Sequence, residues 1–94
     1  MLYEEKLNSF PELLERLRSL DQDAGIRVVG VSSGKRVLVF VTRFGGRYTA
    51  MTYGATSKKG TPGRRLGTRE FASAHEVTVA LQKVVRGRLR AWLY

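Results

Sequence analysis

Hydrophobic residues first recur at helical spacing near the start of the chain. Ser9 precedes Glu12 by three residues, as in a capping box, and Pro11 suits a first helical turn. One apolar stripe then follows, at positions 10, 13, 14, 17 and 20. The pattern predicts an amphipathic helix that stops at Gly25, preceded by a further helical turn within residues 1–8.

The pattern then changes to the alternation typical of strands. We expect strands at residues 26–33, 35–44 and 47–55, joined by a tight turn at Gly34 and a two-residue turn at Gly45-Gly46. Along the second strand, alternation separates Val37, Val39 and Val41 from Leu38, Phe40 and Phe44. Along the third it separates Tyr48, Ala50 and Thr52 from Thr49, Met51 and Tyr53.

Glycine, proline and basic residues interrupt the alternation at residues 54–65, which we predict to be a mobile basic loop. A short edge strand at residues 66–71 follows. Ser73 and Glu76 repeat the capping-box spacing, and apolar residues keep helical spacing from Val77 to Trp92. These residues predict a final helix that runs to the end of the chain.

The predicted elements define one α+β domain over residues 1–94, in the order α-β-β-β-β-α. A single antiparallel four-stranded sheet packs with N- and C-terminal helices. Because the strand at 35–44 is apolar on both sides, both faces of the sheet should be covered, either by the two helices or by one helix and a second subunit.

The C-terminal residues are more apolar than so small a core requires. A homodimer or homotetramer is therefore expected. The predicted interface residues are Val85, Leu89, Trp92, Leu93 and Tyr94. The alternative is an ordinary helix end that folds onto its own sheet.

The distribution of charge along the chain gives the strongest indication of its partner. Residues 1–23 hold three basic and six acidic residues, net −3, whereas residues 24–94 hold fourteen basic and two acidic residues, net +12. Arginine outnumbers lysine twelve to five, and its planar guanidinium pairs with phosphate and stacks on bases. So uneven a charge favours a polyanionic partner.

Other classes of function lose support from the composition. The absence of cysteine excludes disulfides, zinc fingers and a thiol nucleophile, and the single histidine, His75, is expected to be structural or solvated. We therefore expect no metal, no cofactor and no enzymatic activity. No apolar run is long enough to cross a membrane and no export leader is seen, so we expect a cytoplasmic protein without a membrane partner.

Aromatic and basic residues are interleaved around the predicted sheet and loop, as in proteins that track a phosphate chain while bases stack on rings. The predicted nucleic-acid-binding residues are Arg27, Lys35, Arg36, Arg43, Phe44, Arg47, Tyr48, Tyr53, Lys58, Lys59, Arg64, Arg65 and Arg69. Because the first helix is acidic on balance, reading of a duplex groove is disfavoured. Single-stranded DNA is the expected ligand, with RNA left open and little sequence preference.

A sheet followed by a helix, with the basic-aromatic residues above and the loop Lys58-Lys59-Gly60-Thr61-Pro62-Gly63-Arg64, resembles the Whirly-like single-stranded-DNA-binding transcription coactivators. With its N-terminal amphipathic helix, its small size and a composition typical of thermophiles, with few amides and no cysteine, the chain resembles still more the ThermoDBP-related proteins of thermophilic archaea. This resemblance implies single-strand binding in a cleft between sheet and helix, and assembly through terminal helices. The N-terminal helix departs from the coactivator pattern.

Two other functions stay open. The chain is similar in size, charge and element order to RelE-type RNA-targeting toxin ribonucleases, which commonly end in a strand; the predicted long final helix argues against that class. The other is a basic module that docks on structured RNA or on an acidic protein.

Overall fold

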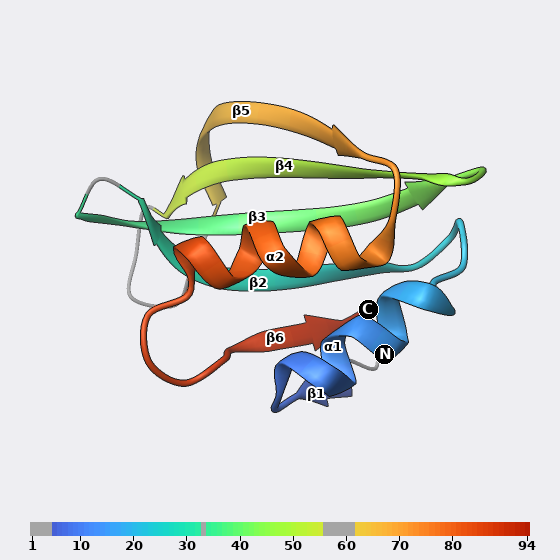
Figure 1. Ribbon diagram of the computed structural model, residues 1–94. Coiled ribbons are helices and arrows are strands. Elements are labelled where there is room, and N and C mark those ends of the chain that lie inside the picture. Colours follow the sequence, from blue (N-terminus) through green and yellow to red (C-terminus); the bar gives the residue numbers. More distant parts are fainter. Residues whose placement is uncertain (1–4, 33, 56–61) are drawn as a thin grey trace.

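The computed structural model describes residues 5–32, 34–55 and 62–94 and shows two helices packed on a six-stranded antiparallel sheet (Figure 1). The elements, in chain order, are β1 (Glu5–Leu7), α1 (Phe10–Arg18), β2 (Gly25–Ser32), β3 (Lys35–Phe44), β4 (Arg47–Ala55), β5 (Pro62–Phe71), α2 (Ala74–Val84) and β6 (Ala91–Leu93). The α+β class and a helix near each end are confirmed. The four-stranded sheet is wrong.

The two additional strands are short and lie side by side. The strand order is β1-β6-β2-β3-β4-β5, so β6 pairs with β1 on one side and β2 on the other. Residues 5–7 were expected to be helical, and so were residues 91–93. Three residues are too few to show an alternating pattern, and each strand exists because its partner strand offers backbone hydrogen bonds.

Both helices begin where their caps predict. The Ser9 hydroxyl accepts a hydrogen bond from the Glu12 N–H at 3.3 Å, and the Ser73 hydroxyl accepts one from the Glu76 N–H at 3.2 Å. The Glu76 carboxylate in turn accepts from the Ala72 N–H at 2.9 Å. Each cap satisfies N–H groups that the first helical turn leaves without partners.

The second helix ends earlier than predicted. Val85 leaves the helical conformation at φ −80° and ψ 127°, and Gly87 adopts φ +71°, which favours glycine. Val85 and Leu89 are nevertheless buried. Apolar residues at helical spacing thus reach the core from an irregular segment, which is why their spacing predicted a longer helix.

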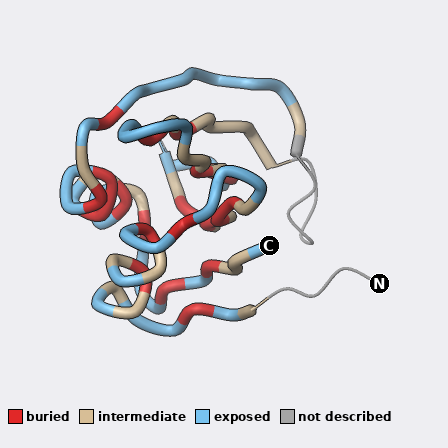
Figure 2. The backbone as a smooth tube through the Cα atoms, turned by 90° about the vertical axis from the view of Figure 1, so that its right-hand side faces the viewer, coloured by how far each residue is buried: buried red, intermediate tan, exposed pale blue. Residues whose placement is uncertain are grey.

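The core lies between the helices and one face of the sheet. Both helices lie on the same side of the strands (Figures 1 and 2). The core side chains of the central strands include Ile26, Val28, Val39 and Val41, and they pack with Leu13, Leu17, Val77 and Leu81 of the helices. Of the two expected arrangements, cover of both faces by the two helices is therefore wrong, and cover of the other face by a second subunit stays a prediction.

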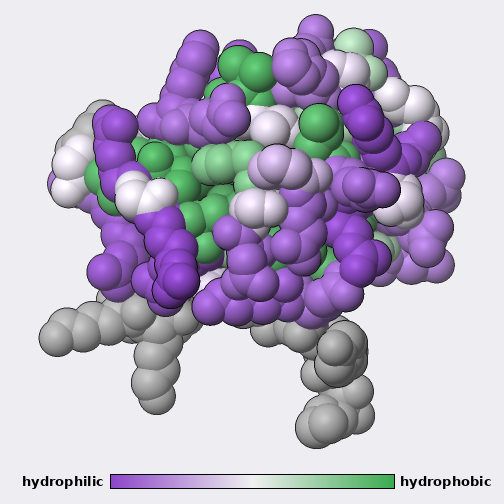
Figure 3. Space-filling view, turned by 60° about the horizontal axis from the view of Figure 1, so that its bottom comes forward, coloured by the Kyte–Doolittle hydropathy of each residue, from purple (hydrophilic) through white to green (hydrophobic). Residues whose placement is uncertain are grey.

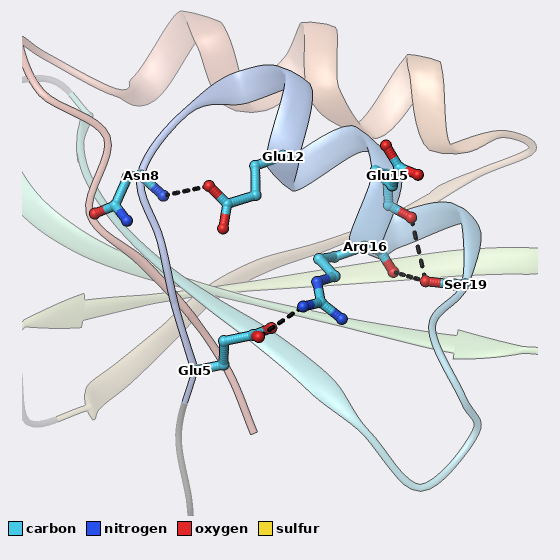
Figure 4. A network of polar contacts seen from close by, with 6 residues as sticks. All are labelled: Glu5, Asn8, Glu12, Glu15, Arg16 and Ser19. Carbon is cyan, nitrogen blue, oxygen red and sulfur yellow. Dashed lines mark hydrogen bonds and ion pairs between the residues drawn. The ribbon is translucent and has the colours of Figure 1, made fainter.

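The first helix is also tied to the edge of the sheet. The Arg16 guanidinium contacts the Glu5 carboxylate of β1 at 2.6 Å (Figure 4). Both side chains are partly exposed, so the pair contributes at most about 1 kcal/mol to stability. Its main effect is to orient α1 over β1.

Candidate nucleic-acid interface

The sheet face opposite the helices carries no packed helix among the described residues. We call it the open face. The register places Phe40 between Arg27 of β2 and Met51 of β4 on this side. The same face also carries Leu38 and Thr42 of β3, Tyr53 of β4, Trp92 of β6, and Tyr94. Exposure varies across the face, because Leu38 is buried while Phe40 and Tyr53 are half-buried.

Three aromatic rings form a cluster on the open face. The ring centroids of Phe40 and Tyr53 lie 5.5 Å apart at an interplanar angle of 86°, and those of Phe40 and Tyr94 lie 6.3 Å apart at 76°. Edge-to-face packing of this kind holds rings in fixed orientations. Because Tyr94 is 43% exposed and the other two rings are half-buried, part of the cluster faces solvent.

Two arginines adjoin a fourth ring, that of the half-buried Trp92. The guanidinium carbon of Arg27 lies 4.9 Å from the Trp92 ring centroid, and that of Arg90 lies 6.0 Å from it. Lys6 of β1 is the cross-strand neighbour of Trp92 and is exposed. A cation therefore lies on each side of the Trp92 ring across β1, β6 and β2, an arrangement that suits a base next to phosphates.

Tyr48 is not part of this surface. It lies on the helix-covered face, is 5% exposed, and donates a hydrogen bond from its hydroxyl to the Leu17 carbonyl at 2.7 Å. A base cannot stack on a ring sealed between sheet and helix, so the predicted stacking role of Tyr48 is wrong. Tyr53, five residues along the same strand, lies on the other face.

The predicted basic residues fall on both faces of the sheet. Arg27 and Arg36 share the open face with Phe40, and Arg65 is the cross-strand neighbour of Tyr53. Lys35 shares the opposite face with Val37, and Arg69 lies over the Phe71 ring there, with its guanidinium carbon 5.1 Å from the ring centroid. One continuous channel that holds every predicted cation is therefore not formed.

Part of the predicted mobile loop is strand instead. Strand β4 continues to Ala55, and β5 already begins at Pro62, so Arg64 and Arg65 are exposed residues of a strand. Lys58 and Lys59 lie outside the described residues.

Seen from below the view of Figure 1, hydrophilic side chains cover most of the surface, with hydrophobic ones between them (Figure 3).

The turn between β3 and β4 presents a further ring. Phe44 is 81% exposed and is the cross-strand neighbour of the exposed Arg47. Arg43, which we expected to hold phosphate, instead donates hydrogen bonds to three backbone carbonyls, those of Arg18, Leu20 and Gly45. Its guanidinium therefore joins the turn to the end of α1.

The predicted assembly residues fall into two groups, one buried in the core of the chain and one partly exposed. Val85 and Leu89 are 8% and 4% exposed and belong to the chain's own core. Trp92 and Leu93 are half-buried in β6, and Tyr94 belongs to the aromatic cluster. Since the long terminal helix does not exist, assembly through it is not available, and a homodimer or homotetramer stays a prediction.

Phe40 and Arg90 were not predicted as candidate binding residues, and Trp92 and Tyr94 were predicted only as assembly residues. Alternation already separated Phe40 from the valines of the same strand, so that signal was present. Trp92 and Arg90 gave no signal of this kind, because their position depends on the pairing of β6 with β2.

We also searched the described part of the chain for a metal site, a pocket and a membrane-spanning helix. No group of three or more acidic or histidine side chains there is placed to hold a metal ion. An apolar cleft of about 80 Å³ lies between α2 and the strands β4 and β5, and His75 is exposed beside a shallow hollow next to it. Over the described residues, neither helix has the length and apolar character needed to cross a membrane.

Comparison with family models, with curated proteins and with solved structures finds no match for this chain. The resemblance to the ThermoDBP-related and Whirly-like proteins therefore stays a prediction.

Proposed function

We propose that this protein binds single-stranded nucleic acid on the open face, without catalysing a reaction and with little sequence preference. The observation that carries the proposal is the aromatic cluster of Phe40, Tyr53 and Tyr94 beside the arginine-flanked Trp92. Rings stack on any unpaired base, and cations beside them neutralise the phosphates between bases. DNA is favoured over RNA as the working ligand, as expected from the resemblance.

The arrangement favours single strands over duplexes. The flat faces of paired bases are hidden inside a double helix, so rings on a sheet can reach them only when the bases are unpaired. Reading of a duplex usually places a helix in the major groove. Both described helices lie on the other side of the sheet, and the exposed residues of α1 include Glu15.

The size of the open face sets the length of the ligand. Trp92 on β6 and Tyr53 on β4 are separated by three strand spacings, which is about 14–15 Å at 4.7–4.9 Å per spacing. A few nucleotides span this distance. Stacking contributes about 1–3 kcal/mol per base, so two or three stacked bases would give measurable affinity.

A fluorescence-anisotropy titration with a labelled ten-residue oligo-dT tests the proposal. We expect tighter binding than to a duplex of the same length, and an affinity that falls as salt rises, because each neutralised phosphate releases a counterion. Equal affinity for the duplex, or no salt dependence, would contradict the proposal.

A matched pair of arginine variants locates the site. Arg27→Gln and Arg69→Gln each remove one charge, but Arg27 contacts Trp92 on the open face while Arg69 lies over Phe71 on the other. We expect Arg27→Gln to weaken binding several-fold and to reduce the salt dependence, by a slope of about 0.7 if it removes one phosphate contact on a single strand. Equal effects of the two variants would argue for diffuse attraction by net charge.

An RNA-targeting toxin of the RelE type is the second candidate. The expected long final helix was the feature against it, and residues 91–93 instead form a strand beside the exposed Arg88 and Arg90. Incubation with translating ribosomes and messenger RNA, followed by mapping of cleaved ends, tests this candidate. Cleavage that Arg88→Ala and Arg90→Ala abolish would replace the binding proposal with an enzymatic one.

A further inference from the structure

The turn between β3 and β4 bears the most exposed large hydrophobic side chain in the described part of the chain. Phe44 is 81% exposed, compared with 59% for Leu66 and 43% for Tyr94. The ring thus makes little contact with the rest of the protein. The ring is therefore free to contact a ligand. Its role depends on how the turn is supported and on where the turn lies relative to the aromatic cluster.

Hydrogen bonds from the Arg43 side chain hold the turn in place. The Arg43 side chain donates to the Gly45 carbonyl at 3.1 Å through its Nε, and to the Arg18 carbonyl at 3.1 Å through one terminal nitrogen. The same nitrogen lies 3.5 Å from the Leu20 carbonyl. These bonds join the turn to the end of α1, so the backbone that carries Phe44 loses little freedom on contact with a ligand.

Phe44 continues the open face beyond the aromatic cluster. Alternation along β3 places Phe40, Thr42 and Phe44 on the same side, and four residues of strand correspond to about 13 Å. A base that stacks on Phe40 therefore cannot also contact Phe44. Arg47, the cross-strand neighbour of Phe44, adds an exposed cation beside the ring.

We infer that Phe44 is a wedge that stacks on the last base pair of a duplex, where the duplex meets the single strand held on the open face. The inference rests on the proposed function and narrows its ligand to a junction between single-stranded and double-stranded nucleic acid. A ring that is 81% exposed on a turn can stack on one base of the terminal pair, whereas the half-buried rings within the sheet are less accessible to the end of a duplex. Arg47 then lies near the phosphates of the terminal pair.

The test compares three fluorescent DNAs: ten unpaired thymidines, the same ten extended from one end of a hairpin duplex, and that duplex alone. The junction is made in both polarities. We expect the wild-type protein to bind one junction about fivefold or more tighter than the single strand, which is the gain from one stacked ring. Phe44→Ala should remove this preference, so that the junction and the single strand bind with affinities equal within about twofold.

Two further variants separate the ring from general hydrophobicity. Phe44→Leu keeps an apolar side chain without a ring and should lose most of the preference. Val79→Ala removes another exposed apolar side chain, on α2, and should keep it. A 2-aminopurine in the terminal base pair should change its fluorescence with the wild-type protein and not with Phe44→Ala.

The outcomes distinguish this inference from the proposed function. If the wild-type protein binds the single strand but shows no preference for either junction, or if Phe44→Ala keeps the preference, the wedge is overturned and the binding proposal stands. If the single strand does not bind at all, both are overturned. An unchanged junction preference in Phe44→Leu would assign the effect to apolar contact and would also overturn the stacking.

Discussion

The Tyr48 hydroxyl donates a hydrogen bond to the carbonyl oxygen of Leu17 at 2.7 Å and so joins β4 to the last turn of α1. The bond is buried, and the Leu17 carbonyl also accepts from the Leu20 N–H at 3.3 Å. This relationship makes Tyr48 a structural residue, in contrast to Tyr53 on the same strand.

Tyr48→Phe should lower the free energy of unfolding by about 1 kcal/mol, because the hydrogen bond is lost while the Leu17 carbonyl keeps a second donor. Urea denaturation measures this change. The affinity for oligo-dT should not change, since the ring lies on the covered face. A clear loss of affinity in a folded Tyr48→Phe protein would contradict the assignment of the two faces.

The single tryptophan reports directly on the open face. Both Arg27 and Arg90 place a guanidinium over the Trp92 ring, so a strand bound there should alter the intensity or wavelength of its emission. Titration with unlabelled oligo-dT should give the same dissociation constant as anisotropy. Binding seen by anisotropy with unchanged tryptophan emission would place the ligand elsewhere.

Arg43 contributes to stability through its three carbonyl contacts. Arg43→Met should lower the free energy of unfolding by roughly 1–2 kcal/mol, since hydrogen bonds from a charged group are lost at a partly buried position. Arg47→Met removes an exposed guanidinium from the same turn and serves as the control, with a change within about 0.5 kcal/mol. Thermal or urea denaturation of the two variants should therefore differ.

Gly30 of β2 lies against the end of α2. A Cβ added there would lie 2.9 Å from the Val84 carbonyl oxygen, which is backbone and cannot move aside easily. Gly30→Ala should therefore cost about 1–3 kcal/mol in stability. Gly67→Ala on β5 has no neighbouring atom within 4 Å and should be tolerated, and equal losses in the two variants would contradict this packing.

Much of the fold was predictable because its signals are local. The strands Lys35–Phe44 and Arg47–Ala55 have the expected bounds, since alternation and the Gly45-Gly46 turn define both. The two serine caps act over three residues and were likewise predictable. Alternation also separated Tyr48 from Tyr53, although it does not show which face the helices cover.

The rest depends on contacts between distant parts of the chain. Helical spacing from Val77 to Trp92 predicted one helix, because a helix, an irregular segment and a short strand can place apolar residues in the core with the same spacing. Trp92 belongs to the candidate site only because β6 pairs with β2. No local pattern encodes that pairing.

The position of β6 between β1 and β2 has a consequence for the order of folding. The meander β2–β5 forms by local hairpins, whereas β1 is joined to the sheet through residues 91–93. During synthesis, residues 5–7 therefore cannot join the sheet until residues 91–93 have left the ribosome. Slow emergence of the tail should leave the meander assembled and the amino-terminal segment unprotected from proteases.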